Sequence, residues 1–151
     1  MRAVIQRVQS AQITIDHGET REIGQGLTVF LGVLEGDTEK QADFLAEKIR
    51  ELRIFSDEVG KMNLSLLDIG GEMLVVSNFT LSTDCKKGRR PSFDRAAPPV
   101  EAKALYERFV EQARTGGVKK VETGEFGAHM DVLVQNDGPV TIIIDTEKIG
   151  K

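Results

Sequence analysis

The stretch "RAVIQRVQSAQITID", residues 2–16, alternates apolar and polar side chains over most of its length. The alternation runs first over Arg2–Gln9 and again over Ala11–Asp16. A period of two residues in a segment rich in valine and isoleucine is typical of half-buried β-strands. The chain is therefore expected to begin with a sheet, and "DHGE", residues 16–19, is expected to form the hairpin turn that follows.

Further strand patterns extend that sheet along the chain. "LTVFLGVL" (27–34) is almost continuously apolar, which favours a central strand, and "EMLVVSNF" (72–79) predicts another. Three more patterns close the chain: "VKKVETG" (118–124), "HMDVLVQN" (129–136) and "PVTIIID" (139–145). Between the last two, "NDG" before Pro139 is interpreted as a turn that ends one strand and starts the next.

Two segments change to the helical period. Over residues 38–53, Thr38 and Gln41 form a capping box, and apolar residues follow at helical spacing. A second helix is predicted from Pro98 to about Arg114 and ends at the following glycine pair. Its expected apolar face comprises Val100, Ala104, Leu105 and Phe109. The prediction is one α+β domain over residues 1–151, with a mostly antiparallel sheet or β-barrel-like core and two main helices.

Composition narrows the function classes. The 151 residues include one cysteine, Cys85, so no intramolecular disulfide and no thiol-based zinc site is expected. No apolar run approaches the roughly 20 residues of a membrane helix, and no signal peptide is recognisable, so a soluble cytoplasmic protein is expected. The net charge of −4 argues against bulk electrostatic binding of nucleic acid but leaves room for a local basic site.

Three short stretches are candidates for chemistry. "SNFTL" (77–81) lies at a strand exit, where backbone amides can face an oxyanion, or where Ser77 and Thr80 simply cap the backbone. "KKGRRPSF" (86–93) concentrates four cations, Lys86, Lys87, Arg89 and Arg90, which either hold phosphates or form a solvated loop.

The third candidate is "GPVT" (138–141), which by itself indicates only a strand boundary, with a trans proline bond as the default. No metal is expected, because His17 and His129 lie far apart in sequence and outside any ligand motif. A serine–histidine triad is not indicated either, since nothing like G-x-S-x-G occurs.

Six motifs in order, "MRAVIQRV", "LRIF", "GKMNLSLLDIGGEMLVVSNFTL", "KKGRRPSF", "VETGEFGA" and "NDGPVT", resemble the D-aminoacyl-tRNA deacylase family along essentially the whole chain. The resemblance implies a homodimer that needs no cofactor. It also implies an editing esterase that cleaves the bond between a D-amino acid, or glycine, and the terminal adenosine of tRNA. The family's signature of serine, glutamine and threonine falls on Ser77, Asn78, Phe79 and Thr80, with Asn78 in place of the usual glutamine.

The second family signature, a Gly-cisPro dipeptide, falls on Gly138 and Pro139. The resemblance implies that these residues reach the partner's pocket and reject L-aminoacyl-tRNA. It further implies attack assisted by the tRNA 2′-hydroxyl, with an oxyanion site at the Phe79 and Thr80 amides, and a nucleophilic Thr80 ranks second. The basic loop would hold tRNA phosphates. Two alternatives stay open: a non-catalytic tRNA-binding module, and a general small-ester hydrolase without an RNA partner.

Overall fold

The long first strand organises the sheet. A computed structural model describes residues 1–151, in which β1 (Arg2–Ile15) pairs antiparallel with β2 (Thr20–Ile23), β3 (Gly26–Gly32) and β8 (Met130–Asp145). The predicted hairpin turn joins β1 to β2, and Asp16 and His17 adopt positive φ there. The alternation at the start of the sequence is thereby confirmed as one continuous strand.

The sheet continues from β3 through two parallel pairings. Its order is β2-β1-β3-β6-β7, where β6 is Glu72–Ser77 and β7 is Lys120–Thr123, and β3–β6 and β6–β7 are both parallel. The central position of β3 was predicted, whereas the parallel pairings were not. A small outlying unit was not predicted from the sequence. It is made of β4 (Phe55–Ser56), β5 (Met62–Leu64) and the short helix α2 (Leu66–Ile69).

The prediction of a turn at "NDG" is wrong. Residues Met130–Asp145 form one strand, β8, which runs through Gly138 and Pro139 and pairs with β1 on both sides of them. Register shifts between Gln6 and Val8 and between Val8 and Ser10 accommodate the unpaired residues. The strand continues because β1 offers a partner along its whole length, so local turn signals are outweighed by pairing across the sheet.

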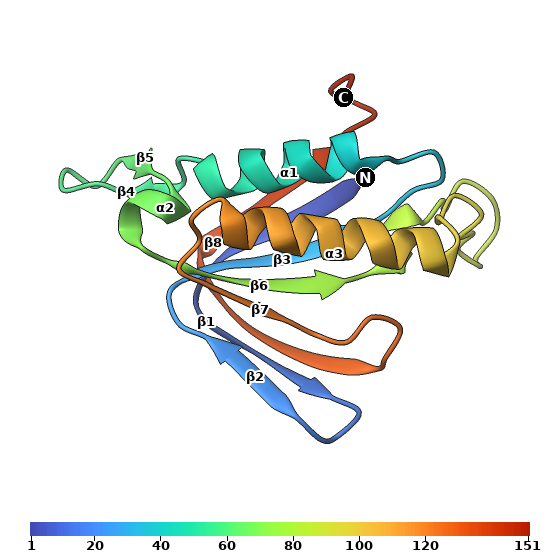
Figure 1. The fold of residues 1–151 in the computed structure, drawn as a ribbon, viewed down its shortest axis with the longest axis horizontal. Helices are drawn as coiled ribbons and strands as arrows, with labels where there is room; N and C mark the ends of the chain where they lie inside the picture. Colours follow the sequence, from blue (N-terminus) through green and yellow to red (C-terminus); the bar gives the residue numbers. More distant parts are fainter.

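Two helices lie side by side over one face of the sheet (Figure 1). Helix α1 (Glu39–Glu51) begins after Thr38, whose amide donates to the Gln41 side chain at 2.8 Å, so the predicted cap is confirmed. Helix α3 spans Pro99–Thr115. Its apolar face is only partly as predicted, because Leu105 and Phe109 are buried whereas Val100 and Ala104 are exposed.

The buried face of α3 is set by what it covers. It comprises Ala102, Leu105, Tyr106, Phe109, Val110 and Ala113, a stripe at spacings of three and four residues. Val100 lies in the first turn on the side that faces away from this stripe, so it remains 83% exposed. The helical period was therefore predicted correctly. Which face of the helix is buried depends on the sheet beneath it.

The apolar core lies in two places. Helices α1 and α3 enclose a large cluster against the sheet, while a second cluster fills the curl formed by β1, β2, β6 and β8. Strand β1 contributes residues to both clusters, with Ile5 in the first and Val8 and Ile13 in the second. The irregularity at Arg7–Val8 allows this change, since both of these neighbours are buried.

The expected fold class is thus confirmed: a single α+β domain with a barrel-like, mostly antiparallel sheet and two main helices. No helix in the structure has the length and apolar character needed to cross a membrane.

Candidate active site

A cavity of about 820 Å³ opens where β3 and β6 end. Fourteen of its twenty lining residues are hydrophobic, so it suits a flat apolar or aromatic group. Ser77, Asn78, Phe79 and Thr80 all line it, as does His129. The structure therefore brings the whole first signature to the mouth of one apolar cavity.

The signature residues sit on a tight turn directly after β6. The strand ends at Ser77, and a 3-10 helix, η1, spans Phe79–Ser82. The amide of Asn78 donates to the Leu31 carbonyl at 2.9 Å, and the first bond of η1 runs from the Leu81 amide to the Asn78 carbonyl. The amides of Phe79 and Thr80 precede that bonded turn and have no partner within it.

The side chains of the turn bond to each other. The Thr80 hydroxyl donates to the Asn78 amide oxygen, and the Ser82 hydroxyl donates to the Phe79 carbonyl at 2.8 Å. The two histidines, distant in sequence, are also neighbours, with ring centroids 6.2 Å apart, and both are exposed. The described residues contain no group of three or more potential metal ligands.

Two aromatic pairs that were not predicted from the sequence line the cavity. Phe79 and Phe93 meet edge to face, with centroids 5.2 Å apart, and Phe79 is 60% exposed. Tyr106 and Phe126 meet at 6.0 Å deeper in the wall. The Tyr106 hydroxyl donates to the Val75 carbonyl at 2.9 Å, and burial raises the pKa of the tyrosine to about 12. The sequence contains no pattern that predicts this wall, only a few isolated aromatic residues in a chain that is poor in them.

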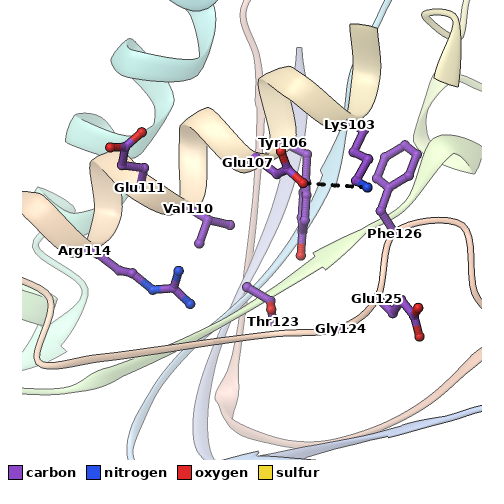
Figure 2. A pocket seen from close by; sticks show the side chains of 10 residues that line it. All are labelled: Lys103, Tyr106, Glu107, Val110, Glu111, Arg114, Thr123, Gly124, Glu125 and Phe126. Atoms are coloured by element: carbon purple, nitrogen blue, oxygen red, sulfur yellow. Dashed lines mark ion pairs between the residues drawn. The ribbon is translucent and has the colours of Figure 1, made fainter. Parts of the chain in front are cut away.

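A smaller groove of about 330 Å³ lies behind that wall, between α3 and the segment after β7 (Figure 2). It shares Tyr106 and Phe126 with the apolar cavity. Its other lining is mainly charged, and Lys103 and Glu107 pair there at 3.9 Å. The Tyr106–Phe126 pair is thus shared by an apolar cavity and a mainly charged groove.

The second signature lies elsewhere on the chain. The Gly138–Pro139 peptide bond is cis, and Gly138 has a φ of +133°. Neither residue lines the apolar cavity of its own chain. A Cβ at position 138 would lie 2.9 Å from the Val140 side chain and 3.2 Å from the Arg7 guanidinium, so only glycine fits.

Arg7, which was not predicted as a site residue, contacts the segment that carries that dipeptide. It is 9% exposed, and its guanidinium donates to the Asp137 and Ile54 carbonyls at 3.2 and 2.7 Å. It also pairs with the Asp137 carboxylate at 3.3 Å. The sequence signal for this role was a charged residue within the pattern of the first strand. An arginine that is buried in a sheet needs several hydrogen-bond partners.

The four cations of the basic loop, Lys86, Lys87, Arg89 and Arg90, are all exposed and lie outside the cavity lining. A bridge between Asp84 and Ser92 closes the loop at its base. Lys86 pairs with Asp84 at 3.6 Å, with its own side chain 86% exposed. The loop therefore presents its charge to solvent, beside the segment that carries Phe93 into the cavity.

Comparison with known proteins gives consistent results. A family model described as D-Tyr-tRNA(Tyr) deacylase matches residues 4–145. Proteins named D-aminoacyl-tRNA deacylase from Thermotoga petrophila and Aquifex aeolicus are 57% and 56% identical over 149 residues, each covering 99% of this chain and 99–100% of the relative.

Solved structures agree in fold. A c-Myc DNA unwinding element binding protein superposes with a TM-score of 0.90 at 42% identity, covering 96% of this chain and 98% of the other. A probable eukaryotic D-amino acid tRNA deacylase has a TM-score of 0.84 at 17% identity, covering 95% and 97%. At that identity the second structure supports the fold alone.

The family model and the relatives that match over the full length place this chain among the hydrolases. Within that class, the chain belongs to the D-Tyr-tRNA(Tyr) deacylase family, whose close relatives are named D-aminoacyl-tRNA deacylase.

Proposed function

We propose that residues 1–151 form one deacylase domain that hydrolyses the ester between a D-amino acid and the 3′-terminal adenosine of tRNA. The observation that carries this proposal is the pair of unbonded amides, Phe79 and Thr80, at the mouth of the apolar cavity in a chain with full-length family similarity. An adenine ring matches the cavity's apolar lining, and the ester would then lie at the turn.

Catalysis rests on positioning and charge stabilisation. The amides of Phe79 and Thr80 stabilise the oxyanion that forms when the ester carbonyl is attacked, and one such donor contributes about a hundredfold to a thousandfold in rate. The 2′-hydroxyl of the terminal ribose assists the attack on an ester that is already labile. Thr80 is not the nucleophile, because its hydroxyl donates to the Asn78 amide oxygen, which is not a base.

Selection against L-aminoacyl-tRNA requires a second copy of the chain. Gly138 and Pro139 lie outside their own chain's cavity, on a strand whose Leu133 and Ile143 are 70% and 67% exposed. A homodimer that covers those side chains carries the dipeptide to the partner's cavity. The dipeptide carbonyls then exclude an L side chain, whereas the D form and the unsubstituted glycyl ester are accepted.

The basic loop completes the site by contacting the tRNA backbone. Lys86, Lys87, Arg89 and Arg90 project into solvent, where phosphates are accessible. Their charge is concentrated in a protein whose net charge is −4, so it attracts the acceptor end locally. The enzyme works in the cytoplasm, where charged tRNA is present.

The deciding experiment compares D-tyrosyl-, L-tyrosyl- and glycyl-tRNA as substrates, each with and without a metal chelator. The expected result is release of D-tyrosine and glycine, retention of the L ester, and no effect of the chelator. Binding of tRNA without release of any amino acid would instead identify a tRNA-binding module. Hydrolysis of simple amino acid esters at the same rate, with no dependence on salt, would identify a general esterase.

A further inference from the structure

The signature turn is tied to the first strand by an arginine that neither signature includes. The Arg2 guanidinium donates through Nη1 to the Leu81 carbonyl in η1. Its other edge contacts the Asp145 carboxylate, with Nε and Nη2 each 3.0 Å from Oδ2. Residues from β1, β8 and η1 are thereby joined in one contact.

The carbonyls of the turn show why this contact matters. Those of Asn78, Phe79 and Thr80 accept hydrogen bonds from residues within or directly after the turn, namely Leu81, Ser82 and Thr83. Such bonds hold the turn's own shape but do not fix its orientation on the sheet. The Leu81 carbonyl differs, because its donor comes from β1.

The turn is also packed closely onto the sheet. A Cβ at Gly32, which pairs with Arg2, would lie 2.8 Å from the Leu81 Cβ and 3.1 Å from the Asn78 carbonyl oxygen. The bond from the Asn78 amide to the Leu31 carbonyl fixes the start of the turn. Arg2 fixes its end, so the amides of Phe79 and Thr80 lie between two anchors.

Asp145 keeps Arg2 in place. Its side chain is only 5% exposed, and its second oxygen accepts from the Glu147 amide at 3.1 Å. Burial acts to raise the pKa of this carboxyl, but the hydrogen bonds and charge of Arg2 outweigh burial and lower the pKa overall. The carboxylate is therefore ionised at neutral pH, and it directs one edge of the guanidinium to itself and the other to Leu81.

We propose that Arg2 is a positioning residue for the hydrolysis, which orients the Phe79 and Thr80 amides through the Leu81 carbonyl while Asp145 orients Arg2. This inference rests on the proposed function, since it assigns those amides to the oxyanion. A displacement of about 1 Å in such a group lowers a rate about a hundredfold. Arg2 contacts no substrate, so its loss changes the chemical step rather than binding.

The test replaces Arg2 by lysine, which keeps the charge beside Asp145 but loses the two-edged contact. The matched control is Arg108→Lys, because Arg108 makes an equivalent pair with Asp43 at 2.7 and 2.9 Å, between α3 and α1. Tags belong at the C-terminus, since the Met1 amino group is itself bonded to Asp37 at 2.6 Å.

For Arg2→Lys we expect kcat on D-tyrosyl-tRNA to fall about tenfold to a hundredfold, with KM within about twofold. Arg108→Lys should retain wild-type kcat. An unchanged kcat for Arg2→Lys, or a rise in KM that accounts for the whole loss, would overturn the inference. If Arg2→Lys unfolds, Asp145→Asn replaces it, and a drop in kcat at constant KM supports the inference while an unchanged kcat contradicts it.

A second readout separates this inference from the proposed function. The amide resonances of Phe79 and Thr80 should shift in Arg2→Lys and remain in place in Arg108→Lys. If the wild-type protein released no D-tyrosine, the proposed function would fail, and the resonances would still test whether Arg2 sets the turn. Unshifted resonances in a folded Arg2→Lys protein would refute the positioning role directly.

Discussion

At the scale of single residues, Asn78 is where this chain departs from its family's usual glutamine. Its amide oxygen accepts from the Thr80 hydroxyl, so the shorter side chain turns back along its own segment. Both side chains lie at the cavity mouth, and the proposed oxyanion donors are backbone groups nearby. In the proposed function, the side chains of this pair support the turn and the backbone amides supply the chemistry.

Replacing Asn78 by glutamine should retain or improve activity, because the amide group is preserved and the family's usual residue is restored.

Thr80→Ala should reduce kcat less than loss of a true nucleophile, by about tenfold rather than the thousandfold or more of a nucleophile variant. Single-turnover release of D-tyrosine from tRNA measures both. A covalent aminoacyl–Thr80 intermediate, or a large loss with Asn78→Gln, would contradict this assignment.

Tyr106 offers a direct measurement of the cavity wall, because it is the chain's one tyrosine and tryptophan is absent. Burial raises its pKa to about 12, so the neutral phenol is favoured in the folded protein. The unfolded chain ionises this phenol near pH 10, where the folded chain still holds the proton. Stability from this group is therefore fully present below about pH 10 and is lost as the pH rises through about 12.

Ultraviolet titration should therefore show tyrosinate forming near pH 12 in the folded protein. The same titration in denaturant should give a value of about 10, as in an unstructured chain. A folded-state titration at about pH 10 would mean that the wall between the two cavities is open to water.

At the scale of elements, the segment between η1 and α3 combines a cavity-lining residue with exposed cations. Its Phe93 reaches into the cavity, while its cations remain in solvent. The bridge between Asp84 and Ser92 fixes the base from which both project. In the proposed complex with tRNA, this base would hold the cavity contact and the phosphate contacts at a set separation.

Neutralising Arg89 and Arg90 to glutamine should weaken tRNA binding and flatten its salt dependence by about one unit of slope for each lost phosphate contact. The control is Lys40→Gln with Lys48→Gln, two exposed cations on α1. Binding isotherms over a range of salt concentrations measure the slope. An unchanged slope in the arginine variant would show that the loop is only a solvated surface.

At the scale of the whole molecule, the proposed enzyme is complete only as a dimer. One chain supplies the cavity and the signature turn, and Gly138 and Pro139 lie outside that cavity. Two large apolar side chains, Leu133 and Ile143, are exposed on the strand that carries the dipeptide. A partner that covers this strand satisfies both observations.

Ile143→Glu should convert the dimer to monomers and abolish discrimination against L esters. An unpaired carboxylate in an apolar interface costs about 3 kcal/mol or more, which raises the dimer Kd at least about a hundredfold. Sedimentation and D/L rate ratios measure the two effects. Val59→Glu is the control, because Val59 is 77% exposed near β4 and β5. A wild-type monomer with full D selectivity would refute the dimer.

Features that depend on neighbours along the chain could be predicted from the amino-acid sequence. Alternation over residues 2–16 specified β1, and the Thr38–Gln41 cap specified the start of α1. The ordered motifs also sufficed to indicate the family. These signals are accessible because strand period, helix period and capping involve residues a few positions apart.

How these elements combine depends on contacts that form only in the folded chain. Local signals at "NDG" predicted a turn, yet β8 continues because β1 pairs with it on both sides of Gly138 and Pro139. Arg2 and Arg7 make their contacts only because folding brings β1 against η1 and β8, which lie more than seventy residues away in sequence. Burial and hydrogen bonding between such distant residues carry no local pattern, and so only the tertiary structure reveals them.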